Sequence, residues 1–216
     1  DHGASSHAHK AARSGHGIGR KHRRVTRYAE SPVEKGGSKV RIRRSSEPDP
    51  ALSLPIETPR LLLREFVSRD LDAVHSYSSR DEVTRFLVWG PNTLMQSKQT
   101  IRGFLDDQKE RPRTSFDLAI VAKGTGRRGE RPRLIGGVGL KLADWENRTG
   151  DIGYVLHPDY WGQGYAVEAA RGLAHAGFRD FGLQRIVATC DQRNKASARV
   201  MEKLGMRREG AFRQSQ

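Results

Sequence analysis

Residues 153–170 read GYVLHPDYWGQGYAVEAA and predict a strand, a tight turn and a helix in immediate succession. The apolar run that ends at Leu156 is typical of a strand, Pro158 stops it, and apolar residues at helical spacing follow Gly164. Gly162 and Gly164 let the backbone turn tightly and let a ligand approach closely. Successive backbone N–H groups then point at the ligand, helped by the positive end of the helix dipole. The stretch therefore predicts an anion cradle made of backbone, which needs no side-chain cation.

Two better-known phosphate motifs fit this stretch poorly. The glycines are not followed by Lys-Ser or Lys-Thr, so the turn is not a Walker P-loop. Val167 stands where a dinucleotide-binding GxGxxG motif needs its third glycine. A Gly-x-Gly turn between a strand and a helix also occurs as a plain tight turn that binds nothing. Taken alone, the two glycines therefore leave phosphate binding and a plain turn both open.

Outward from this stretch, apolar runs and helical spacings predict a layered domain. The β-α-β unit at the end of the chain indicates an α/β or α+β fold with a mixed sheet. The strands at 116–122 and 134–142 are joined by a Gly/Arg-rich loop and are expected to form a hairpin. The expected elements are strands over 60–66, 116–122, 134–142, 151–156 and 185–190, and helices over 68–77, 95–109, 164–181 and 194–204.

The first 50 residues differ in composition from the rest of the chain. They carry 12 of the 39 Lys and Arg residues against 5 of the 25 Asp and Glu residues, with almost no large apolar side chains. Such a segment buries too little apolar surface to offset the entropy lost on ordering. We therefore expect a disordered basic tail over residues 1–50 and a folded domain over residues 51–216. The basic run 20–24 could contact a polyanion weakly, although a solvated tail without a partner explains it more simply.

The composition also excludes several classes of protein. No run of about 18 apolar residues occurs, so no membrane-spanning helix is expected, and the N-terminus lacks the apolar core of a secretory signal. The single cysteine, Cys190, cannot form an internal disulfide, and no Cys and His set suits a metal site. Cys190 follows the apolar run IVAT, which indicates a buried structural thiol rather than a nucleophile. A cytoplasmic protein without a metal is therefore expected.

With its flanks, the stretch resembles the GNAT superfamily of acetyl-CoA-dependent N-acetyltransferases, and most of all its RimJ/RimL-like branch. The resemblance covers residues 54–213 and implies a mixed, mostly antiparallel central sheet flanked by helices on both faces. Relatives continue beyond Met206 with a final pair of strands, so we expect the C-terminal strands to be incomplete in this chain. The matching blocks, in order, are TPRLLLR (58–64), IGGVG (135–139), DIGYVLHPDYWGQGYAVEA (151–169), NKAS (194–197) and EKLGM (202–206).

The resemblance implies where acetyl-CoA, a co-substrate, would bind. The family signature Q/R-x-x-G-x-G/A falls on residues 161–166, with Trp161 in place of the usual Gln or Arg. In relatives the amides of this loop hold the pyrophosphate, the preceding strand pairs with the pantetheine amides, and an asparagine of the closing helix hydrogen-bonds the cofactor. The residues that inherit these roles are Gly162, Gln163, Gly164, Tyr165 and Ala166 in the loop, Tyr154, Val155 and Leu156 in the strand, and Asn194 in the helix.

The resemblance also implies direct attack of a neutral primary amine on the thioester in a ternary complex. The amine, from a protein N-terminus or a small molecule, must first lose a proton. Asp151 is the best general base, and its alternative is a solvated or salt-bridged carboxylate. Glu82 is a weaker candidate for substrate contact. Ser197 is the candidate partner of the departing thiol, and its alternative is a hydroxyl that satisfies a backbone donor of its helix.

Two classes of function stay open. One is an active N-acetyltransferase. The other is a binding module, either a coenzyme-A-binding domain without catalysis or an RNA- or ribosome-associated protein that uses its basic tail. The presence of Asp151, Asn194 and Ser197 favours the enzyme. The sequence specifies neither the acceptor amine nor the oligomeric state.

Overall fold

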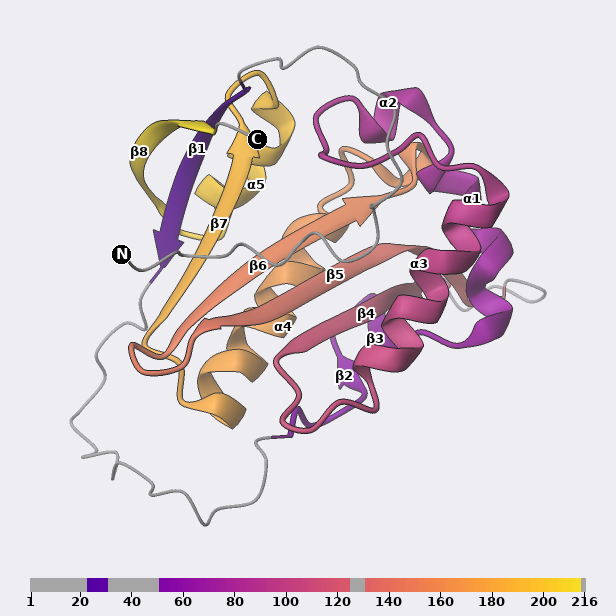
Figure 1. Ribbon diagram of the computed structural model, residues 1–216, viewed down its shortest axis with the longest axis horizontal. Helices are drawn as coiled ribbons and strands as arrows, with labels where there is room; N and C mark the ends of the chain where they lie inside the picture. The colour runs from indigo at the N-terminus through magenta and orange to yellow at the C-terminus, as the bar shows by residue number, and fades with distance from the viewer. Residues whose placement is uncertain (1–22, 31–50, 125–130, 215–216) are drawn as a thin grey trace.

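Eight strands form one sheet in the computed structural model of the protein, which describes residues 23–30, 51–124 and 131–214. Their order across the sheet is β2-β3-β4-β5-β6-β7-β1-β8. All neighbouring strands are antiparallel except β6 and β7, which are parallel. Helices cover both faces (Figure 1). The mixed, mostly antiparallel architecture expected from the sequence is therefore confirmed.

Strands β3 to β7 and helices α1, α3, α4 and α5 lie near the positions that apolar periodicity predicted, whereas β1, β2, β8 and the short helix α2 were not predicted. The strands are β1 Arg23–Glu30, β2 Ile56–Glu57, β3 Leu61–Glu65, β4 Ser115–Ala122, β5 Arg133–Asp144, β6 Thr149–Leu156, β7 Arg185–Asp191 and β8 Arg207–Gln214, and the helices are α1 Leu71–Ser78, α2 Asp81–Thr84, α3 Leu94–Asp107, α4 Tyr165–Phe181 and α5 Lys195–Lys203. Short 3₁₀ turns, Ser68–Asp70 and Pro158–Tyr160, precede α1 and α4. Among the described residues, no helix is both long and apolar enough to cross a bilayer.

Alternation along the strands separates two apolar layers. On β4, Leu118 and Ile120 face a core that includes Leu173 of α4 and Met201 of α5. The intervening Ala119 packs in a second core with residues of α1 and α3. Figure 1 shows α1 and α3 in front of the sheet and α4 behind it. Every side chain of the central strands therefore belongs to one of two chemically different faces, which decides where site residues can act.

Strand β1 lies inside the sheet, between β7 and β8, although residues 1–50 were expected to be disordered. For residues 23–30 that prediction is wrong. The three arginines of the segment RRVTRYAE made it look polar, although its alternating residues fit a strand. Thr26 and Tyr28 share one face of that strand and are only 4% and 5% exposed. Pairing on both edges supplies the stabilisation that the local sequence lacks. The rest of the expected tail, including most of the basic run 20–24, lies outside the described residues.

A substitution in β1 tests its place in the sheet. Thr26→Pro is expected to lower the free energy of unfolding by about 3 kcal/mol, because proline removes a ladder donor from an interior strand. Thr26→Val keeps a β-branched residue and is the matched control. Chemical denaturation of the full chain measures both. Equal midpoints for the proline variant and the parent would contradict the position of β1 between β7 and β8.

The chain after Gly205 forms one strand. Residues 207–214 form β8, where the resemblance implies a pair of strands in relatives. Its described strand partner is β1, from the other end of the chain, with Tyr28 opposite Arg208 and Thr26 opposite Ala211. Because β1 separates β7 from β8, the N-terminal strand joins the last strand to the rest of the sheet.

Candidate active site

The site begins where two parallel strands part. Strands β6 and β7 pair at Thr149, Gly150 and Asp151, and no further pairing between them is present over residues 152–156, although both strands continue. On its other edge β6 stays paired with β5 as far as Leu156. One edge of β6 is therefore left open for a ligand in the described part of the sheet.

The open edge presents specific backbone groups. His157 donates its N–H to the carbonyl of Ile135 on β5, at 2.8 Å. Backbone groups of successive residues point to opposite edges of a strand, so those of Tyr154 and Leu156 point away from β5 and toward the gap. Trp161 Nε1 donates to Leu156 O at 2.9 Å, which leaves the Leu156 N–H and both groups of Tyr154 for a ligand. Amides of an extended ligand could pair with them as another strand would.

The loop after β6 has the tight, glycine-dependent turn that the sequence predicted. Gly162 and Gly164 have φ of +75° and +82°, which lie in the left-handed region that residues other than glycine rarely adopt. Gly164 is the N-cap of α4 and has no side chain to satisfy the free N–H groups of the first turn. The Trp161 contact brings this loop back to the end of β6. Backbone donors at the start of a long helix and the open strand edge thus meet at one place.

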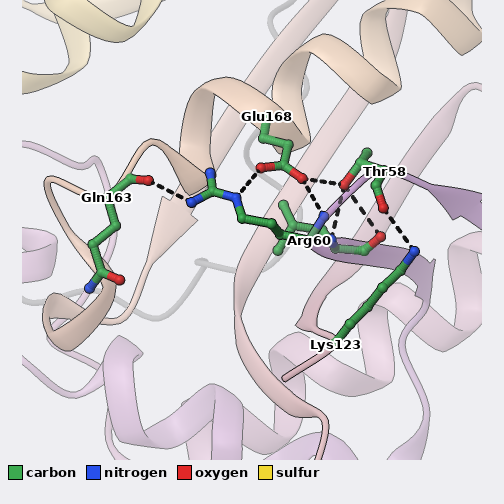
Figure 2. Close-up of polar contacts among 6 residues, drawn as sticks. Thr58, Arg60, Lys123, Gln163 and Glu168 are labelled. Atoms are coloured by element: carbon green, nitrogen blue, oxygen red, sulfur yellow. Dashed lines mark hydrogen bonds and ion pairs between the residues drawn. The ribbon is translucent and has the colours of Figure 1, made fainter. Parts of the chain in front are cut away.

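A side chain that the sequence analysis assigned no role supports this loop. Arg60, which immediately precedes β3, donates from Nη1 to the carbonyl of Gln163 at 3.0 Å and from Nε to Glu168 Oε2 at 2.6 Å (Figure 2). Its guanidinium carbon lies 4.3 Å from the centre of the Tyr165 ring. The Glu168 carboxylate points to Arg60 and Thr58.

Ser197 and Tyr154 meet on the α4 and α5 side of the sheet. The Tyr154 hydroxyl lies 3.0 Å from Ser197 Oγ and donates to Ser197 O, also at 3.0 Å. Burial raises the pKa of Tyr154, so its phenol keeps its proton. Asn194 Oδ1 accepts the Ser197 N–H at 3.0 Å as the N-cap of α5. Its predicted bond to the cofactor would therefore come from the amide nitrogen, and it stays a prediction.

Cys190 lies next to this pair and is 9% exposed. Burial raises the pKa of its thiol, with a smaller opposing effect from a hydrogen bond to Ser197. A protonated, buried thiol is a poor nucleophile. The interpretation of Cys190 as structural is confirmed in its burial.

Asp151 lies on the opposite face of the sheet. It is an odd number of residues from Tyr154 on an unbulged stretch of β6, so its side chain points to the α1 and α3 side. Burial raises the pKa of Asp151 to about 6, and the positive charges of Arg27 and Lys141 offset part of the rise. The structure does not bring Asp151 against Ser197. It places a candidate base on one face and a candidate acid on the other.

A second carboxylate on the same face was missed by the sequence analysis. Asp117 of β4 faces the α1 and α3 side, and burial raises its pKa to about 6. Gly139 of β5 and Gly153 of β6 follow it across the sheet in register, and a Cβ on Gly139 would lie 2.6 Å from Asp117 Oδ1. Nothing lies within 4 Å of a Cβ on Gly153. The glycines leave the side-chain layer open between Asp117 and the edge of β6.

Glu82 lies apart from these residues, in α2. It lines a surface hollow of about 580 Å³ with Asp81, Arg85 and Val88. The segment after α2 reaches the turn after β7, because the Phe86 ring lies 5.7 Å from the guanidinium carbon of Arg193. Its role as a substrate contact stays a prediction.

The parted strands and the backbone loop place an open strand edge beside the start of a long helix. The sequence model described as an acetyltransferase (GNAT) domain matches residues 60–207. The uncharacterized N-acetyltransferase YnaD of Bacillus subtilis is 35% identical over 158 residues, which cover 73% of this chain and 85% of that protein. The crystal structure of a GNAT-family acetyltransferase from Bacillus anthracis is similar, with a TM-score of 0.60 and 33% identity over 73% of this chain and 86% of that one. This chain therefore belongs to the GNAT acetyltransferase family and is an acyltransferase.

More distant structures share the fold. RimL, a ribosomal L7/L12 α-N-protein acetyltransferase solved in complex with coenzyme A, has a TM-score of 0.56 at 20% identity, over 68% of this chain and 79% of that chain.

Proposed function

We propose that this protein transfers the acetyl group of acetyl-CoA to a primary amine by direct attack in a ternary complex, and that it is a RimJ/RimL-like enzyme. The observation that carries the proposal is the open edge of β6 beside the backbone loop at the start of α4. The pantetheine amides would pair with the backbone N–H and carbonyl of Tyr154, and the pyrophosphate would lie on the N–H groups of residues 162–166. The backbone groups of Val155 point to β5 and not to the gap, so Val155 would not pair with the pantetheine as the sequence predicted. Asn194 would add a side-chain contact.

The two faces of β6 then divide the chemistry. The amine approaches from the α1 and α3 side, where Asp151 accepts its proton directly or through a water molecule. The amine nitrogen bonds to the carbonyl carbon while the carbon–sulfur bond breaks. The Leu156 N–H, which points into the gap, stabilises the negative charge that develops on the carbonyl oxygen. On the other face, Ser197, held in place by the Tyr154 hydroxyl, donates a hydrogen bond to the departing thiolate, which takes its proton from solvent.

The acceptor is a primary amine, from a protein N-terminus or a small molecule. RimL, which shares this fold, is described as an α-N-protein acetyltransferase, and this supports a peptide N-terminus as one class to test. A cytoplasmic location and a weak polyanion contact through the basic run 20–24 remain predictions.

Two measurements on the full chain test the proposal. Calorimetry is expected to show binding of acetyl-CoA in the micromolar range, and a thiol assay is expected to show CoA release only when an acceptor amine is present. The amine panel should include peptides with different N-terminal residues and small primary amines. Binding without release across the panel would favour the coenzyme-A-binding module, and no binding by the folded chain would overturn the proposal.

A further inference from the structure

The phosphate loop is fixed from outside by one side chain. Arg60 contacts three parts of the loop and the helix that follows it: the Gln163 carbonyl, the Tyr165 ring and the Glu168 carboxylate. Figure 2 shows the guanidinium between the loop that carries Gln163 and the first turn of α4. Arg60 and Glu168 are 108 residues apart in sequence. The contacts therefore join the start of β3 to the loop on which the pyrophosphate would lie.

The contact with the Gln163 carbonyl orients a donor of the cradle. In a trans peptide the carbonyl of Gln163 and the N–H of Gly164 point in opposite directions. Arg60 holds that carbonyl on its own side, so the Gly164 N–H points away from the guanidinium. Gly162 and Gly164 both have a left-handed φ. Because glycine populates many backbone conformations, the loop sequence alone does not fix the orientation of the peptide between Gln163 and Gly164. Without Arg60, this peptide would be free to rotate its N–H out of the cradle.

The contact with Glu168 neutralises a carboxylate that lies close to the proposed pyrophosphate site. A carboxylate in the first turn of α4 would repel a diphosphate that binds at the same helix end. Glu168 instead accepts hydrogen bonds from Thr58 Oγ1 at 2.6 Å, from the Arg60 N–H at 2.8 Å and from Arg60 Nε. Burial alone would raise the pKa of Glu168, but these bonds outweigh it and hold the pKa below its usual range. The carboxylate therefore stays charged, turned toward Arg60 and neutralised there.

The segment that carries Arg60 is itself fixed. Lys123 Nζ donates to the Thr58 carbonyl at 2.8 Å and to Glu57 Oε2 at 3.0 Å (Figure 2). The Lys123 N–H donates to the Arg60 carbonyl at 3.0 Å. The residue directly after β4 thus holds the start of β3, which in turn holds the loop. This rigid support is what a positioning role requires.

We propose that Arg60 is a positioning residue for acetyl-CoA: paired with Glu168, it presets the amides of the 162–166 loop for the pyrophosphate without being a phosphate ligand itself. The inference rests on the proposed function and adds to it a residue pair outside the glycine loop. A positioning role predicts that the effect of a substitution depends on which part of the donor is bound. Substitutions at Arg60 weaken binding of the part of the donor that carries phosphates and leave the pantetheine and acetyl end unaffected.

The test compares two donors. In Arg60→Gln, the Kd for CoA and the KM for acetyl-CoA are expected to rise about tenfold, the size of one charged hydrogen-bond interaction, with kcat nearly unchanged. With S-acetylpantetheine, which has no phosphates, kcat/KM should equal that of the parent. Arg179→Gln makes the same change at the far end of α4, on an exposed guanidinium paired with Asp180, and should change neither donor. An equal loss with both donors would show a merely structural role and overturn the proposal.

A double variant separates positioning from direct contact. If Arg60 acts through Glu168 and the loop, Arg60→Gln/Glu168→Gln should bind CoA more tightly than Arg60→Gln, because the unpaired carboxylate is gone. If Arg60 were a phosphate ligand, Glu168→Gln alone would free its guanidinium for the phosphates and tighten CoA binding, which would contradict the proposal. Failure of the parent to bind CoA would instead contradict the proposed function, and the positioning role with it.

Discussion

Asp151→Asn is expected to lower kcat for acetyl transfer about 100-fold or more, the usual contribution of a general base. Asparagine has nearly the same shape but cannot accept the amine proton. Acetyl-CoA binding should not change, because Asp151 lies on the α1 and α3 face and the proposed contacts of acetyl-CoA with β6 use only its backbone. Steady-state kinetics with saturating amine, together with calorimetric titration of acetyl-CoA, measure the two effects separately.

The pH dependence follows from the raised pKa of Asp151, about 6 in the folded protein. Because the base must be ionised, kcat is expected to rise with pH through about 6 and then level off. An α-amino substrate has a pKa near 8 in water, about two units above the pKa of Asp151. Its titration affects the rate in the same way with the parent and with Asp151→Asn. Loss of the inflection near 6 in Asp151→Asn would assign it to this carboxyl.

Stability should change in the opposite sense to activity. An unfolded Asp has a pKa near 3.9, so between about 4 and 6 the folded protein binds more protons than the unfolded chain. Asp151 therefore lowers the free energy of unfolding as pH rises through that window, and the cost persists above it. Asp151→Asn should be more stable than the parent at pH 8 and equal to it near pH 4. Thermal unfolding at the two pH values checks the sign.

The control for this variant is Asp106→Asn, the same change on the exposed surface of α3. It should alter neither kcat nor the pH profile. If Asp151→Asn stays near the activity of the parent, Asp151 is not the base. Asp117 would then be the next candidate, since it faces the same side, has a similarly raised pKa and looks across Gly139 and Gly153 toward β6. Asp117→Asn is the variant that decides between them.

The sequence predicted the strand, turn and helix around residues 153–170 well because every part of this segment is local. Gly162, Gly164 and the helix that follows are neighbours in the chain, and their conformations follow from glycine's freedom and from helix geometry. The same holds for the β4 and β5 hairpin and for α4, whose apolar spacing is regular. Roles that depend on one strand or one turn could therefore be assigned from the order of residues alone.

The contacts that join distant segments could not be predicted in this way. Arg60 and Glu168 both lie in stretches singled out in the sequence, but nothing in either stretch indicates that they pair. The pKa of Asp117 is raised mainly by burial on the α1 and α3 side of the sheet, and also by the negative charge of Asp107 on α3. Strand β1 is stabilised by pairing with β7 and β8 at the far end of the chain, and its local composition predicts disorder. Long-range pairing, rather than propensity, decided each of these cases.

Gly164→Glu is expected to abolish acetyl-CoA binding, with at least a ~100-fold rise in Kd. Two like charges about 4 Å apart near a protein surface repel by about 4 kcal/mol, which alone corresponds to several hundredfold. The new carboxylate would stand at the N-cap of α4, where the pyrophosphate is expected. The left-handed φ of +82° adds strain for any side chain. Calorimetric titration of acetyl-CoA, with circular dichroism to verify folding, measures the loss.

Two controls separate the effect of the negative charge at position 164 from backbone strain and from the addition of a carboxylate anywhere on the protein. Gly164→Ala imposes the same left-handed strain without a charge, since a Cβ there meets only Arg60 Nη2 at an ordinary 3.5 Å, and it should weaken binding much less than the glutamate. Gly103→Glu adds the same carboxylate on α3, where nothing lies within 4 Å of a Cβ, and should bind acetyl-CoA like the parent. Equal losses in the alanine and glutamate variants would mean that the loop is a strained turn rather than an anion site. The order parent, alanine and glutamate in falling affinity is the result that only a bound anion at the start of α4 explains.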